Sequence, residues 1–98
     1  MGVMTLEEFT ASLAQPSPPT HMSTLLRALW QDARGDWDAA HRLAQDVDDA
    51  EGAWVHAYLH RKEGDLGNAA YWYRRAGQRP ASDSLQDEWT RIVRALLR

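Results

Sequence analysis

The stretches GDWDAAHRLAQDV (residues 35–47) and GDLGNAAYWYRRA (residues 64–76) decide the fold, because the second repeats the pattern of the first 29 residues later. In each copy a Gly-Asp pair precedes a helical pattern, and this order is typical of one helix that ends on a left-handed glycine and another that begins with an aspartate cap. The sequence therefore predicts two copies of one helix-turn-helix unit. The shift aligns Ala28 with Ala57, Leu29 with Tyr58, Gly35 with Gly64, Asp36 with Asp65, Ala40 with Ala69, and Val47 with Ala76.

Apolar residues recur at three- and four-residue spacing, and alternating β-branched runs are nearly absent, so we expect an all-α protein. Capping residues, glycines and prolines delimit about six helices, at residues 5–14, 20–34 (starting at Thr20 or Ser23), 37–47, 50–63, 66–76 and from Ser84 onward. In the last helix a single apolar stripe predicts docking on the core; it consists of Leu85, Trp89, Ile92, Val93, Leu96 and Leu97.

One domain is expected over residues 1–98, because a chain of this length supports a single core. Residues 1–22 are predicted to form a short helix and a proline-rich linker, residues 23–77 two helical hairpin repeats, and residues 78–98 a capping helix. The first and last helices, or a second chain, would cover the ends of so short a repeat array.

The composition and charge of the chain exclude several kinds of site and partner. The chain has no cysteine, which excludes disulfides and thiolate metal sites and favours a cytoplasmic location. The formal net charge is −3, with three Arg against eight acids in residues 1–50 and eight Lys or Arg against six acids in residues 51–98. This balance lacks the basic footprint of a nucleic-acid binder. No signal peptide or membrane-spanning run is expected either.

The repeat pattern resembles the tetratricopeptide repeat, in the small residues Ala28 and Ala57, in the Gly-Asp turns and in the aromatic Tyr73. The period of 29 is shorter than the family's, and the proline that normally ends its second helix is missing from both copies. Residues 28–77 also resemble a widespread group of small uncharacterised bacterial and fungal proteins, through the words HAYLHRKEGD and NA.YWYRRAG. That resemblance implies no particular activity.

His56, His60 and Glu63 fall within one narrow stripe of the predicted helix 50–63. Two imidazoles at i and i+4 have the spacing that binds a divalent metal, but the order differs from the zincin motif. A complete site would need a further ligand from the neighbouring helix, such as His41. The opposite face of that helix is apolar, so we expect His56 and His60 to face a groove or solvent and to hydrogen-bond across the hairpin.

The segment YWYRRAG (residues 71–77) suggests nucleic-acid binding, with aromatic rings that stack on bases and arginines that bind phosphates. The angular positions of these residues around a helix favour a simpler interpretation. Ala69, Trp72, Tyr73 and Ala76 share one face that should pack on the preceding helix, which leaves Tyr71, Arg74 and Arg75 outside. Only one aromatic ring then remains free to stack. The two arginines also complement the carboxyl end of the helix dipole.

Gly64, Asp65 and Asn68 are expected to form the turn and the helix cap. The fold alone does not require the remaining polar residues of the second copy, so they are the candidates for a binding site. The leading hypothesis is a module that binds a peptide, protein or small polar ligand around the second hairpin, without a cofactor, with Arg61 or Arg75 holding a carboxylate or phosphate. One alternative is a metal- or histidine-dependent enzyme using His56, His60 and Glu63, and another is a structural homodimer contact. The candidate binding residues are His56, His60, Arg61, Glu63, Asn68, Tyr71, Trp72 and Arg75.

Overall fold

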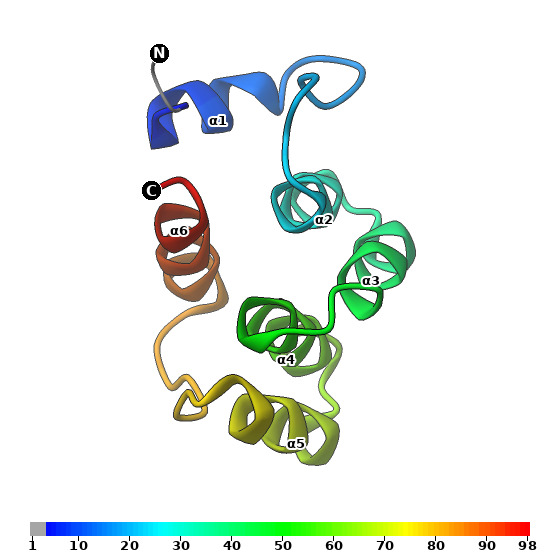
Figure 1. The fold of residues 1–98 in the computed structure, drawn as a ribbon, viewed down its shortest axis with the longest axis vertical. Coiled ribbons are helices and arrows are strands. Elements are labelled where there is room, and N and C mark those ends of the chain that lie inside the picture. The colour runs from blue at the N-terminus through cyan, green and yellow to red at the C-terminus, as the bar shows by residue number, and fades with distance from the viewer. Residues whose placement is uncertain (1–3) are drawn as a thin grey trace.

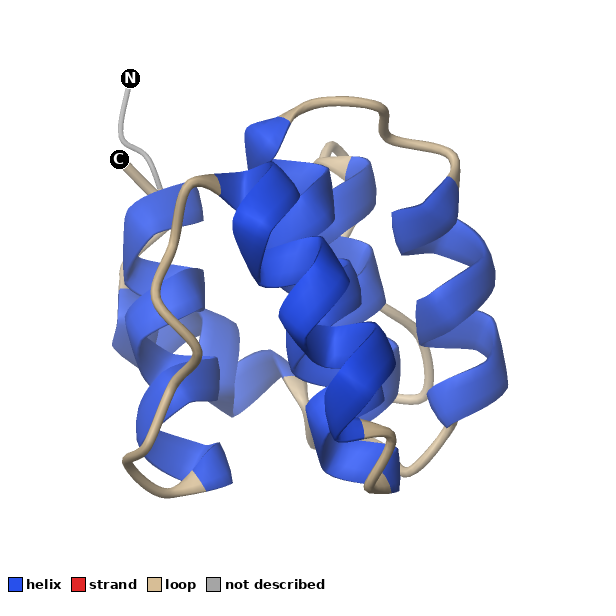
Figure 2. Cartoon of the chain, turned by 90° about the horizontal axis from the view of Figure 1, so that it is seen from below, coloured by secondary structure: helices blue, strands red, loops and turns tan. Residues whose placement is uncertain are grey.

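Six α-helices form the part of the chain that the structure, a computed structural model, describes, which is residues 4–98 (Figure 1). The all-α prediction is confirmed, because the described residues form helices and loops without a strand (Figure 2). Each helix agrees with its expected range to within a few residues. None of the helices in residues 4–98 has the length and apolar character needed to cross a bilayer. The helices are α1 (Leu6–Ser12), α2 (Thr24–Ala33), α3 (Trp37–Gln45), α4 (Ala50–Glu63), α5 (Leu66–Ala76) and α6 (Leu85–Leu96).

The helix boundaries follow from local capping chemistry. In α1 the Thr5 side chain accepts from the Glu8 backbone N–H while the Glu8 carboxylate accepts from the Thr5 N–H, which is the predicted capping box. Every other helix begins in the same way with one side-chain acceptor. These acceptors are Ser23, Asp36, Asp49, Asp65 and Ser84.

The two Gly-Asp turns have the same backbone conformation. Gly35 and Gly64 have φ of 89° and 90°, in the left-handed region that a side chain disfavours. In each turn the following aspartate donates its N–H to a carbonyl five residues back, Asp36 to Gln31 at 2.9 Å and Asp65 to His60 at 3.0 Å. The turns therefore close α2–α3 and α4–α5 into two equivalent hairpins.

The helices from α2 to α5 pack in chain order, each against the next, and α6 returns to lie against α4 and α2 (Figure 1). Helix α1 closes the remaining side, where the buried Phe9 ring meets Trp89 at 5.7 Å between centroids. Trp89 also donates its indole N–H to the Leu29 carbonyl across the core. The expected stripe of the last helix is therefore the face that contacts the rest of the domain.

The interior is divided into two apolar groups of unequal size. The larger one joins residues of α1, α2, α3, α4 and α6. The smaller one contains Ala57, Ala69 and Tyr73, and it lies between α4 and α5. Helix α5 thus rests mainly on α4, which makes α4 the central helix of the second hairpin.

Candidate functional site

Three histidines, His41, His56 and His60, form one group at the contact between α3 and α4, which we name the histidine cluster. One ring nitrogen from each lies within 4.8 Å of the others. His41 Nε2 and His56 Nε2 are 2.9 Å apart, a hydrogen bond in which one imidazole donates and the other accepts. The ring centroids of His41 and His60 are 5.1 Å apart. The structure therefore brings His41 to the pair that the sequence singled out.

Burial of this cluster differs from the sequence-based expectation. His56 and His60 were expected to face a groove or solvent, yet each is only 7% exposed. The reason is that α4 has a helix on either side. His41 of α3 meets both rings, while Trp72 of α5 stacks on His56 with centroids 3.9 Å apart. His56 and His60 are therefore interior, whereas Glu63 at the end of the same stripe is exposed.

Glu63 fixes the orientation of one imidazole. Its Oε2 lies 2.7 Å from His60 Nδ1, one helical turn earlier. A neutral imidazole that donates from Nδ1 to a carboxylate carries its lone pair on Nε2. In the neutral form of His60, this contact favours the tautomer whose lone pair is on Nε2, and Glu63 positions the ring.

Burial and neighbouring imidazoles favour the uncharged form of His41 and His56. Loss of solvent, followed by repulsion from His41 and His60, lowers the pKa of His56 from 6.5 to about 4. The pKa of His41 is lowered as well, mainly by burial and then by His60, against smaller opposing effects of Glu63 and Asp38. At neutral pH both rings are therefore neutral, and the lone pair of one of them accepts the hydrogen bond between their Nε2 atoms.

A groove borders the cluster on the side of α5. It has a volume of about 440 Å³ and runs between the α3–α4 connection, the first turns of α4 and the end of α5. The Arg75 guanidinium lies 5.1 Å from the Trp72 ring centroid, and Trp72 also stacks on His56 and meets the edge of Tyr71. Arg75 Nη2 also forms an exposed ion pair with Asp48 Oδ1 at 3.7 Å. The lining residues are Gln45, Val47, Asp48, Asp49, Ala50, Gly52, Ala53, His56, Trp72 and Arg75.

The remaining candidate residues lie elsewhere. Arg61 points to α6, where its guanidinium donates to Glu88 Oε1 at 2.8 Å and to the Asp83 carbonyl, so it is occupied in holding the fold. Asn68 lies in the first turn of α5, where its backbone N–H binds the Asp65 cap. Tyr71 is exposed and accepts a hydrogen bond from Arg75 at 3.0 Å. Of these three, only Tyr71 touches a groove residue.

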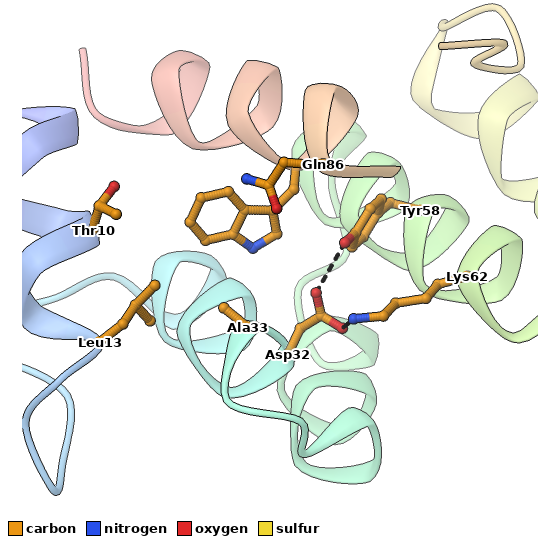
Figure 3. Close-up of a pocket in the computed structure, with 8 residues that line it drawn as sticks. Thr10, Leu13, Asp32, Ala33, Tyr58, Lys62 and Gln86 are labelled. Carbon is orange, nitrogen blue, oxygen red and sulfur yellow. Dashed lines mark hydrogen bonds and ion pairs between the residues drawn. The ribbon is translucent and has the colours of Figure 1, made fainter. Parts of the chain in front are cut away.

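Sequence reasoning missed a second polar site, the Asp32 cavity, which lies between α1, α2, α4 and α6 (Figure 3). The buried Asp32 carboxylate accepts from Tyr58 Oη at 3.0 Å and from Lys62 Nζ at 2.8 Å, and the cavity beside it is about 340 Å³. Burial, then the charge and hydrogen bond of Asp32, raises the pKa of Tyr58. The sequence signal that could have predicted this site is the position of Asp32, an acidic residue, on the buried face of α2.

Comparison with known proteins adds no relative. A scan against protein-family models, a search of curated proteins and a search of solved structures each found no match. The resemblance of residues 28–77 to a group of bacterial and fungal proteins, and the tetratricopeptide likeness, stay predictions. The interpretation of the site therefore depends on its own geometry.

Proposed function

We propose that this chain is a small helical binding module whose ligand lies in the groove beside α5. The observation that carries the proposal is the stacked row of Arg75, Trp72 and His56 along one wall of that groove. Three candidate residues that are spread over 20 positions of sequence form one continuous surface there. Helical-repeat modules use side chains from adjacent helices in the same way.

The chemistry of the row favours a ligand with a carboxylate or phosphate group. Arg75 is held over Trp72 and by Tyr71 Oη, yet about half of its side chain is exposed. A guanidinium held in place in this way loses less side-chain freedom when it binds an oxyanion in a two-point contact. The exposed Asp48 carboxylate is its present partner, and a ligand anion would replace it.

The volume of the groove agrees with a small ligand or the end of a peptide. Pockets for such ligands commonly span about 300 to 1,000 Å³ and combine aromatic walls with a few polar groups. This groove, at about 440 Å³, has an aromatic wall, one cation and two carboxylates. The carboxylates of Asp48 and Asp49 would suit an amine on the same ligand.

A nuclear magnetic resonance titration tests the proposal on the untagged protein. Inorganic phosphate and N-acetylglycine serve as probes, with the Trp72 indole N–H and the Arg75 Nε–H as reporters. Saturable shifts at both groups are expected. Arg75→Ala should weaken binding at least about tenfold, because a charge-assisted hydrogen bond contributes about 1.5 to 3 kcal/mol.

Arg74→Ala is the matched control, since Arg74 is an adjacent exposed arginine that does not line the groove. Its affinity for both probes should equal that of the parent protein. Shifts that do not saturate, or that are equally reduced by both substitutions, would contradict an ordered anion site at Arg75.

The two alternatives remain separate predictions. A histidine-dependent enzyme would also need a nucleophile, and no serine or threonine is among the ten residues that line the groove. A homodimer contact through the second hairpin would make unfolding depend on protein concentration, which denaturation at two concentrations measures.

A further inference from the structure

The histidine cluster has the composition and position of a transition-metal site. We propose that His41, His56 and His60 bind one divalent metal ion, for which Zn²⁺ is the best fit, and that Glu63 orients His60. This inference does not rest on the proposed anion-binding function, because Arg75 and the groove anion take no part in it.

The geometry needs only small side-chain adjustments. Zn²⁺ binds imidazole nitrogens at about 2.0 to 2.1 Å, so two such nitrogens in a tetrahedral site are about 3.3 Å apart. The three ring nitrogens already lie within 4.8 Å of one another, and the His41–His56 pair, at 2.9 Å, is slightly too close. The His41–His56 pair needs to open by about 0.4 Å, and the widest pair needs to approach by up to about 1.5 Å, which rotation of the imidazole rings about their side-chain bonds can supply.

The backbone holds the three ligands independently of a metal. His56 and His60 are one turn apart on α4, so both rings project from the same face. His41 comes from α3, where its ring stacks on Trp37 at 4.9 Å between centroids. Two ligands from one helix and a third from its neighbour are a common way to fix a metal between packed helices.

Glu63 gives the cluster a feature that hydrogen-bonded packing alone does not need. Histidine ligands usually donate their second ring nitrogen to a carboxylate, which fixes the tautomer and increases the basicity of the bound nitrogen. His60 Nδ1 and Glu63 Oε2, 2.7 Å apart, have this arrangement. The Glu63 carboxylate is therefore assigned as a positioning group, with Nε2 of His60 as the ligand atom.

The ligand set and its surroundings select the class of ion. Three imidazoles without thiolate or several carboxylates favour Zn²⁺ and its neighbours Co²⁺, Ni²⁺ and Cu²⁺ over Mg²⁺ or Ca²⁺. Three protein ligands leave a fourth tetrahedral position for water or a ligand group. His56 lines the groove, so an ion can enter from that side.

Cobalt absorption spectroscopy on the untagged, chelator-treated protein tests the site. Co²⁺ is the probe, because a tetrahedral Co²⁺ centre absorbs visible light much more strongly than the hydrated ion. We expect one Co²⁺ per chain and its displacement by Zn²⁺. His41→Phe, which keeps a ring against Trp37 but removes the nitrogens, should abolish the tetrahedral spectrum.

Two further variants make the result specific. Glu63→Gln should retain the spectrum but weaken Co²⁺ binding about 10- to 100-fold, as expected for an orienting carboxylate. His21→Asn changes the fourth histidine, which is exposed and lies at φ 66°, a conformation that asparagine tolerates, and it should bind like the parent. Arg75→Ala should also bind Co²⁺ normally, which separates this site from the anion groove.

A measurement without substitutions guards against misfolded variants. In a ¹⁵N spectrum of the imidazoles, Zn²⁺ should move the ring nitrogens of His41, His56 and His60 and leave those of His21 unchanged. If Zn²⁺ moves none of the three rings, or if Co²⁺ binding survives in a folded His41→Phe variant, the cluster is a hydrogen-bonded aromatic contact and the proposal is wrong.

Discussion

The two hairpins, α2–α3 and α4–α5, share a turn but differ in what surrounds them. In the repeat, Arg27 corresponds to His56 and Gln31 to His60, and Leu43 corresponds to Trp72. Arg27 is exposed, whereas His56 is buried. The difference arises because α4 lies between α3 and α5, while α2 has no hairpin on its other side. A repeat position therefore acquires its environment from its place in the stack.

The residue after each Gly-Asp pair also depends on its place in the stack, but here the residue of the first hairpin is the covered one. Trp37 follows the first turn and donates its indole N–H to the Leu59 carbonyl of α4 at 2.8 Å, because the next hairpin packs there. Leu66 follows the second turn and is 66% exposed. The first hairpin is thus covered at this position, and the second has an open edge.

The largest effect is expected where the second hairpin contacts α6. The fully buried Glu88 carboxylate accepts from Tyr73 Oη, Arg61 and the Trp54 indole. Glu88→Ala would leave these donors without their acceptor, so the free energy of unfolding should fall by about 3 to 5 kcal/mol. Urea denaturation measures the loss.

Asp87→Ala, one residue away but exposed, provides the control and should change the free energy of unfolding by less than about 0.5 kcal/mol. If Glu88→Ala proved equally mild, the buried hydrogen bonds of Glu88 would contribute little to the contact between the second hairpin and α6.

An intermediate effect is expected from pH, and it should be largest at His56 of the second hairpin. The groups that face His56 are His41 on α3 and His60 on α4, with Arg75 of α5 beyond Trp72. Its pKa falls from 6.5 to about 4 on folding, so between these values the unfolded chain binds a proton that the folded chain does not. The free energy of unfolding should therefore decrease as pH falls from 6.5 to 4, by up to about 3 kcal/mol. Above pH 6.5, His56 should cause no further change in the free energy of unfolding.

Urea denaturation of the chelator-treated protein at pH 7 and pH 4.5 checks this dependence. His56→Gln removes the titrating group, so the parent should lose more stability than the variant between the two pH values. Equal losses would mean that His56 is solvated enough to titrate normally. Arg27, at the same repeat position of the first hairpin, keeps its charge over this whole range.

The smallest difference between the two hairpins is expected for substitutions in their Gly-Asp turns. Gly35→Ala and Gly64→Ala would each place a side chain at a φ near 90°, with no other atom within 4 Å of the added Cβ. Each substitution should therefore cost about 1 to 2 kcal/mol from backbone conformation alone. Thermal or urea unfolding should show two equal losses within about 0.5 kcal/mol, and a clear inequality would show that the turns are not equivalent.

Local signals in the sequence were sufficient for the helices. The Thr5–Glu8 capping box, the Gly-Asp pairs and the proline barriers act within a few residues, so they could be read from the chain directly. The face of α5 was also predictable from helical angles, because Ala69 and Tyr73 are buried while Tyr71 is exposed. Such features do not depend on distant partners.

The candidate site was only partly predictable, for a physical reason. The pairing of His56 with His60 follows from helical spacing, but the approach of His41 depends on how α3 packs on α4. Arg61 looked like a ligand-binding cation because its partner, Glu88, is 27 residues away. Charged residues that meet between distant helices cannot be paired from sequence spacing, and the same holds for Asp32 and Lys62.

The unequal division of the core has a consequence for local motion. Helix α5 rests on a small apolar group and is attached to α6 through the Tyr73–Glu88 hydrogen bond, so we expect it to detach from α4 before the larger core unfolds. Its amide hydrogens should therefore exchange with deuterium faster than those of α2 or α4. Trp72 and Arg75 travel with this helix, and any molecule that bridges them to α4 would slow the exchange of all of α5.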